Sequence, residues 1–92
     1  NHDQAVNRNE LKGGPSKGRF QIQRAPWEAY SSVPWETGAH DPVISRKVCK
    51  AILSDCRREC LRRHWPATFK NIRKIYRRGG FVQPKGYKKI AA

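Results

Sequence analysis

The densest group of side chains that could do chemistry lies in the second half of the chain. Residues 57–78 contain nine Lys or Arg, seven of them Arg, and one acid, Glu59. The guanidinium group of Arg is planar and always charged, and it can bind a phosphate through two parallel hydrogen bonds. With the C-terminal lysines added, the predicted phosphate-binding residues are Arg57, Arg58, Arg62, Arg63, Lys70, Arg73, Lys74, Arg77, Arg78, Lys85, Lys88 and Lys89.

Aromatic side chains are interleaved with these cations. They are His64, Trp65, Phe69 and Tyr76. Unstacked RNA bases commonly stack on aromatic rings and on arginine planes. The spacing of three and four residues from Phe69 through Ile72 to Tyr76 also fits the apolar stripe of a helix. For Phe69 and Tyr76 we therefore favour a position in the core over a role in base stacking.

A second group of chemically capable residues consists of Cys56, Cys60 and His64, which are four residues apart. Neighbouring members could ligate one metal ion, but helical geometry separates Cys56 from His64 by about 12 Å along the axis. A zinc or iron–sulfur site would need further ligands from another subunit. Together with Cys49, the two cysteines also fit the buried stripe of a helix as small apolar side chains, which we favour. The odd total of three cysteines makes a disulfide the weakest alternative. We predict no cofactor.

Catalysis is not predicted. Cys60 and His64 could form a nucleophile and base, but so short a chain offers no evident pocket or oxyanion hole. The carboxylates are scattered, and Gly13-Gly14 follows no predicted strand as a phosphate-binding loop would. We therefore expect neither an enzyme nor a small-molecule substrate.

The charge is unevenly distributed along the 92 residues. The net charge is +13, from twenty Lys or Arg and seven Asp or Glu. Residues 1–41 carry five bases and five acids, whereas residues 42–92 carry fifteen bases and two acids. Such asymmetry indicates that the second half contacts a polyanion, and that the neutral first half contacts neighbouring proteins. The sequence contains no run of about eighteen apolar residues, so we predict no transmembrane helix.

Two helices are expected to position the basic residues. Asp41 and Pro42 are typical of a helix start, and Pro66 of a helix end or bend, which predicts a helix over about 41–65. A second helix is predicted over about 67–78, because Gly79 suits the position just past a helix end. These helices form a basic amphipathic centre over 41–79, folded as a hairpin or elbow.

The remaining residues are expected to form arms. Residues 1–40 contain glycine, proline and polar residues, and 1–24 should be disordered in free solution. The segments Ala25-Pro26-Trp27-Glu28 and Val33-Pro34-Trp35-Glu36 repeat eight residues apart. Trp27 and Trp35 fit two interpretations equally well: anchors on neighbouring proteins, or covers for the chain's own helices. Residues 80–92 are predicted to be a basic C-terminal tail.

The resulting prediction is a mostly α fold: a small two-helix hairpin or elbow with long extended N- and C-terminal arms, not an independent globule. No zinc-finger spacing, basic zipper or helix-turn-helix pattern is present, which favours RNA over DNA. This build resembles the small accessory proteins of ribosomes, whose tails thread between rRNA segments; the resemblance is one of style and rests on no motif.

From these features we expect a structural constituent of a ribosome that contacts rRNA and neighbouring proteins. The chain starts at Asn1 and contains no Met, so we expect a processed or partial sequence, and an organellar ribosome in the mitochondrial matrix. One alternative is an accessory subunit of a mitochondrial respiratory membrane complex, and another is a binder of acidic proteins. The arginine density exceeds what lipid headgroups need, which favours RNA over a membrane as the partner.

Overall fold

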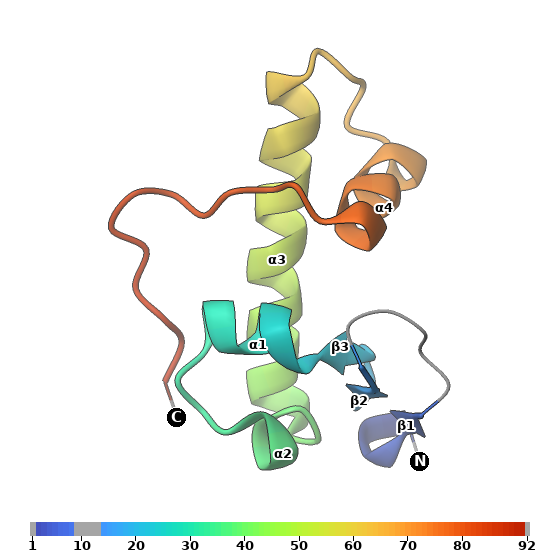
Figure 1. Ribbon diagram of the computed structural model, residues 1–92, viewed down its shortest axis with the longest axis vertical. Helices are drawn as coiled ribbons and strands as arrows, with labels where there is room; N and C mark the ends of the chain where they lie inside the picture. Colours follow the sequence, from blue (N-terminus) through green and yellow to red (C-terminus); the bar gives the residue numbers. More distant parts are fainter. Residues whose placement is uncertain (1, 9–13, 92) are drawn as a thin grey trace. The chain divides into compact units, whose positions relative to one another are not determined.

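The computed structural model describes residues 2–8 and 14–91 (Figure 1). In chain order the elements are η1 (His2–Gln4), β1 (Val6–Asn7), β2 (Ser16–Lys17), β3 (Ile22–Gln23), α1 (Arg24–Tyr30), α2 (Trp35–Gly38), α3 (Pro42–Arg62) and α4 (Phe69–Arg78). The chain divides into two compact units. The first unit consists of Asn1–Cys49 and Lys88–Ala92, and the second of Lys50–Tyr87, so that α3 contributes residues to both.

The first unit contains a small antiparallel sheet in the order β1-β2-β3. Val6 pairs with Lys17, which in turn pairs with Ile22. The turn after β2 depends on Gly18, whose φ is +82°. A Cβ atom at Gly18 would lie 1.9 Å from the carbonyl oxygen of Ala39, so only glycine fits this close approach.

The core of the first unit is built around two tryptophans. Trp27 of α1 is 0% exposed and Trp35 of α2 is 4% exposed. Both indole N–H groups are satisfied: Trp27 Nε1 donates to the Val33 carbonyl at 2.7 Å, and Trp35 Nε1 donates to the Ile22 carbonyl at 2.9 Å. Satisfying these donors removes the main penalty for burying the indole rings.

The prediction of a two-helix hairpin with long extended arms, and not an independent globule, is therefore wrong. Of the described residues, those before Asp41 form three short strands, a 3-10 helix and two α-helices. At the other end of the chain, Ile90 donates its amide to Tyr30 at 2.8 Å and accepts from the amide of Ser32 at 2.9 Å. The physical reason is that Trp27, Tyr30 and Trp35 supply enough buried apolar surface to order a segment rich in glycine, proline and polar residues.

The ends of α3 are fixed by specific hydrogen bonds. Asp41 caps the first turn, as predicted, because its Oδ1 accepts from the amides of Val43 and Ile44 at 2.9 and 3.0 Å. The helix ends at Arg62, before the predicted residue 65. The amide of Trp65 donates to the Cys60 carbonyl, while His64 adopts a φ of +61°. This C-terminal cap closes the helix before Pro66 is reached.

The second unit contains α4 alongside the C-terminal half of α3 (Figure 1). Thr68 caps α4 by accepting the amide of Asn71 at 3.2 Å, and the helix ends before Gly79, whose φ is +70°. Ile75 is fully buried, so it defines the inward face of α4. Within the described ranges, no helix has the length and apolarity needed to cross a membrane.

Candidate nucleic-acid interface

The outward surface of α4 is strongly basic. At about 100° per residue, its five cations fall within an arc of roughly 140° on the side of the helix away from Ile75. All five are exposed. We call this surface the α4 basic face, and its residues are Lys70, Arg73, Lys74, Arg77 and Arg78.

The cations of the α4 basic face have no carboxylate partner among the described residues. In the part of the chain that the structure describes, no Asp or Glu lies within ion-pair distance of any of them. Their position on the helix also brings two of them, Arg77 and Arg78, into the last turn, where the helix dipole favours positive charge. The face can therefore accept several phosphates without first breaking an ion pair.

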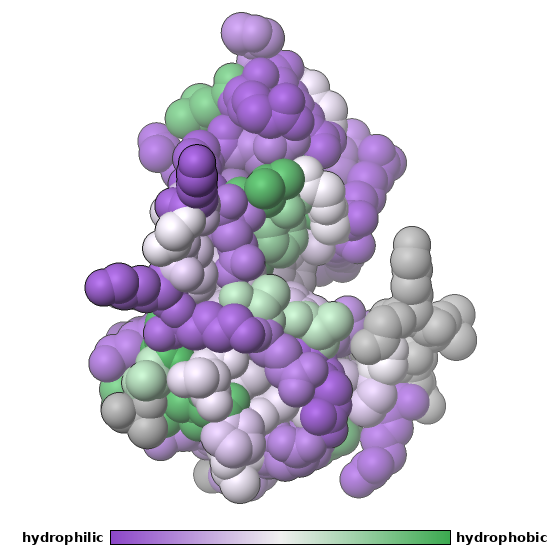
Figure 2. Space-filling view, turned by 60° about the vertical axis from the view of Figure 1, so that its left-hand side comes forward, coloured by the Kyte–Doolittle hydropathy of each residue, from purple (hydrophilic) through white to green (hydrophobic). Residues whose placement is uncertain are grey.

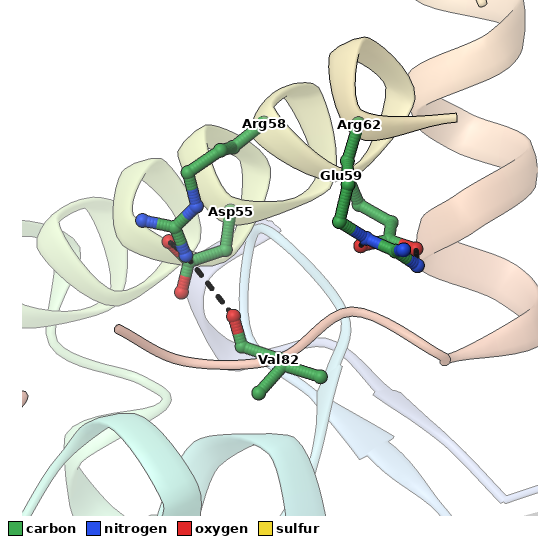
Figure 3. Close-up of a pocket in the computed structure, with 5 residues that line it drawn as sticks. All are labelled: Asp55, Arg58, Glu59, Arg62 and Val82. Carbon is green, nitrogen blue, oxygen red and sulfur yellow. Dashed lines mark hydrogen bonds and ion pairs between the residues drawn. The ribbon is translucent and has the colours of Figure 1, made fainter. Parts of the chain in front are cut away.

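The arginines near the end of α3 are arranged differently. Arg58 Nη2 lies 2.8 Å from Asp55 Oδ1 and donates to the Val82 carbonyl at 3.0 Å (Figure 3). Arg62 makes two hydrogen bonds to Glu59, and Arg63 Nε lies 2.7 Å from the same carboxylate. All three arginines were predicted to bind phosphate, and in the structure they form ion pairs with two acids of α3.

The two acids are almost completely buried, with Asp55 6% and Glu59 5% exposed. Charge-assisted hydrogen bonds from Arg62, and then from Arg63, lower the pKa of Glu59 from 4.5 to about 2. The same carboxylate raises the pKa of Arg62. Glu59 and Arg62 therefore stay ionised at neutral pH, and the hydrogen bonds hold them together with Arg63 as a structural cluster.

A hollow of about 300 Å³ lies beside this cluster (Figure 3). It is lined by Asp55, Arg58, Glu59, Arg62 and Val82. Its acids and its arginines already form ion pairs with one another, so their charges stabilise the fold. The hollow offers no nucleophile and base in reach of each other, and we assign it no chemistry.

The aromatic residues near α4 differ in how accessible they are. Trp65 is half-buried, with the guanidinium of Arg63 5.3 Å and the ammonium of Lys74 5.7 Å from its ring centre. Tyr76 is half-buried as well. Phe69, for which we favoured a core position, is instead 78% exposed. Phe69 is the first residue of α4, where a side chain can project outside the buried stripe defined by Ile75.

The other four predicted phosphate-binding residues lie outside α4 in the sequence. Arg57 and Lys85 are exposed residues of the second unit, on α3 and on the segment that follows α4. Lys88 and Lys89 are exposed too, but they belong to the first unit. The structure thus groups five of the twelve predicted residues on one surface and assigns three to buried acids.

Trp27 and Trp35 lie inside the first unit. The burial of both rings favours the interpretation that they complete the chain's own core. The Trp35 ring is also covered by Lys17, whose Nζ is 4.5 Å from the ring centre, and by Arg24 at 4.8 Å. Lys17 and Arg24 therefore pack on an aromatic ring of their own unit.

The cysteines and His64 differ in their surroundings. Cys56 and Cys60 are 0% exposed, whereas His64 is exposed beyond the end of α3. Burial, with smaller contributions from Asp55 and Cys60, raises the pKa of Cys56 to about 12, so its thiol stays protonated at neutral pH. Across residues 2–8 and 14–91, no three His, Cys, Asp or Glu side chains are grouped to hold a metal ion. The buried-stripe interpretation of the cysteines is therefore favoured.

Hydrophilic side chains dominate the face of the molecule drawn in Figure 2, where apolar residues form small patches between them. The α4 basic face is the arrangement of described residues with the strongest chemical character. Comparison with protein-family models, with curated proteins and with solved structures finds no match to this chain.

Proposed function

We propose that this chain is a non-enzymatic RNA-binding protein, and a structural constituent of a ribosome, that contacts rRNA phosphates through the α4 basic face. The observation that carries the proposal is the group of five exposed cations without a carboxylate partner in the described residues. The second unit contains eleven Lys or Arg against two acids, and both acids already hold arginines. The uncompensated charge is therefore available to a polyanion.

The proposed mechanism is positioning and charge neutralisation. Each phosphate that a cation neutralises releases counterions, so that affinity falls as salt rises. Contacts of this kind fix the register of an RNA segment and carry little sequence information. The interface is a preformed helix surface, and this differs from the threading arms that the sequence suggests. The mitochondrial matrix remains the location that we propose on the sequence alone.

The proposal is tested by removing three charges from the α4 basic face. The variant Arg73→Ala, Arg77→Ala, Arg78→Ala should weaken RNA binding and reduce the slope of log K against log salt by about 2, at about 0.7 per lost contact with single-stranded phosphate. Titrations of the full chain against labelled RNA at several salt concentrations measure this slope. All three residues are exposed, so circular dichroism should show an unchanged fold.

The matched control removes the same charge from another exposed surface of α3. Its substitutions are Arg46→Ala, Lys47→Ala and Lys50→Ala, and it should leave most of the salt slope intact. An equal loss of slope in both variants would show that net charge alone drives binding, and the proposed interface would be rejected.

A further inference from the structure

Phe69 is unusual among the aromatic residues of the second unit. It is 78% exposed, while Trp65, Tyr76, Phe81 and Tyr87 are half-buried. Single exposed apolar side chains are common on proteins and need no explanation by themselves. The position of Phe69 is what gives it significance. It precedes Lys70 and lies one helical turn before Arg73, so its ring borders the α4 basic face.

Tyr76 of α4 is half-buried, and Trp65 lies close to one cation of the α4 basic face, Lys74, but its ring already has partners. Arg63 and Lys74 lie within 5.3 and 5.7 Å of its centre. The Trp65 ring is half-buried with two cations near it, one of which, Arg63, is also bound to Glu59, so it is less accessible to a base than the Phe69 ring. Trp65 therefore serves as a packing element of the second unit, and Phe69 provides the accessible ring.

We infer that the RNA segment bound by the α4 basic face is single-stranded, and that one of its unpaired bases stacks on Phe69. This inference rests on the proposed function. The cations attract phosphates of either a duplex or a single strand, but in a duplex the faces of the bases are covered by their neighbours. An accessible ring beside cations that have no carboxylate partner in the described residues is the combination found where proteins bind single-stranded nucleic acid. A neutral apolar partner would leave those cations without compensation.

The test compares the full chain and its variants against three probes. The probes are a single-stranded oligouridylate of twelve nucleotides, an abasic strand of the same length, and a blunt RNA duplex. Phe69→Ala should weaken binding of the oligouridylate roughly 5- to 150-fold, the range expected for loss of one base–aromatic stack. It should leave the abasic strand and the duplex within about twofold, and it should leave the salt slope unchanged because no cation is removed.

Two further variants separate stacking from apolar contact. Phe69→Trp should restore oligouridylate binding, whereas Phe69→Leu, which keeps an apolar side chain without a ring, should not. Leu61→Ala removes a different exposed apolar side chain, 52% exposed on α3, and should have no effect on any probe.

The outcomes distinguish this inference from the proposed function. If the unmodified chain binds oligouridylate and Phe69→Ala binds it equally well, the stacking inference is overturned and phosphate binding stands. If Phe69→Ala weakens the duplex as much as the single strand, the preference for single strands is overturned. If the unmodified chain binds none of the probes, the proposed function fails together with the inference.

Discussion

The two units contain the same residue types, but these residues have different roles in each unit. In the first unit, two arginines are held by the fold: Arg19 pairs with Asp3 at 2.9 Å, and Arg24 contacts Glu36 and lies over the Trp35 ring. In the second unit, the cations of the α4 basic face have no acid among the described residues, and Phe69 is exposed. The difference shows that a basic or aromatic residue is evidence for an external binding partner only where no other group of the fold already binds it.

The contrast in aromatic residues predicts the largest effect on stability. Trp27→Ala should lower the free energy of unfolding by about 3–5 kcal/mol, because it removes a fully buried ring and its hydrogen bond to Val33. Thermal or urea denaturation followed by circular dichroism measures the loss. The matched variant Trp65→Ala, at a half-buried ring of the second unit, should cost clearly less. Equal losses would remove the distinction that we draw between the aromatic residues of the two units.

The buried acid of the second unit predicts an effect on acid stability. The folded state lowers the pKa of Glu59 from 4.5 to about 2, so its ionised form stabilises the fold above about pH 4.5. That contribution is lost as the pH falls from about 4.5 towards 2. Glu59→Gln should therefore flatten the stability profile over this range, as measured by denaturation midpoints at successive pH values.

The control for Glu59 comes from the first unit. The pKa of Glu36 is lowered by a backbone hydrogen bond and by Arg24, but half of its side chain is exposed. Solvent screens such a pair, so Glu36→Gln should change the acid profile less than Glu59→Gln. A larger change at Glu36 would contradict the structural role given to the cluster in α3.

The smallest predicted effect concerns two residues with positive φ. His64 follows α3 in the second unit with a φ of +61°, a conformation that costs a non-glycine residue about 1 kcal/mol. His64→Gly should relieve this strain and raise stability by about 0.5–1 kcal/mol, whereas His64→Ala should not. Thermal denaturation compares the three proteins.

Gln21 in the first unit provides the contrasting case. Its φ is +51°, but its side chain donates to the Gly18 carbonyl at 2.8 Å and accepts from Ser16 at 2.9 Å. Gln21→Gly should therefore bring no gain, because these hydrogen bonds are lost along with the strain. A gain at Gln21 equal to that at His64 would show that the side-chain bonds contribute nothing.

Local signals in the sequence were sufficient to locate α3 and α4. Asp41 and Pro42 stand at the start of α3, and Gly79 stands just beyond α4. The early end of α3 was not predictable, since its cap places His64 in a conformation that favours glycine. The sheet was not predicted because strands of two residues are too short to show an alternating pattern.

The candidate site was only partly predictable from the sequence. The basic cluster is evident from composition, but composition does not show that Arg58, Arg62 and Arg63 form ion pairs with acids of α3. Glu59 precedes Arg62 and Arg63 by three and four residues, which is the spacing of helical ion pairs, so this pairing was visible in the sequence. The exposure of Phe69 was not visible, because its spacing from Ile72 and Tyr76 is equally typical of a buried stripe.

The reactivity of the buried thiols can be used to measure local unfolding of α3. Cys56 and Cys60 are fully enclosed in the second unit, and burial also raises the pKa of the half-buried Cys49 in the first. An alkylating reagent reacts with thiolates, so modification of Cys56 and Cys60 requires molecules in which the helix has locally opened. Mass spectrometry of the wild-type protein gives the rate of alkylation at each cysteine. This rate measures how often each part of α3 unfolds under native conditions.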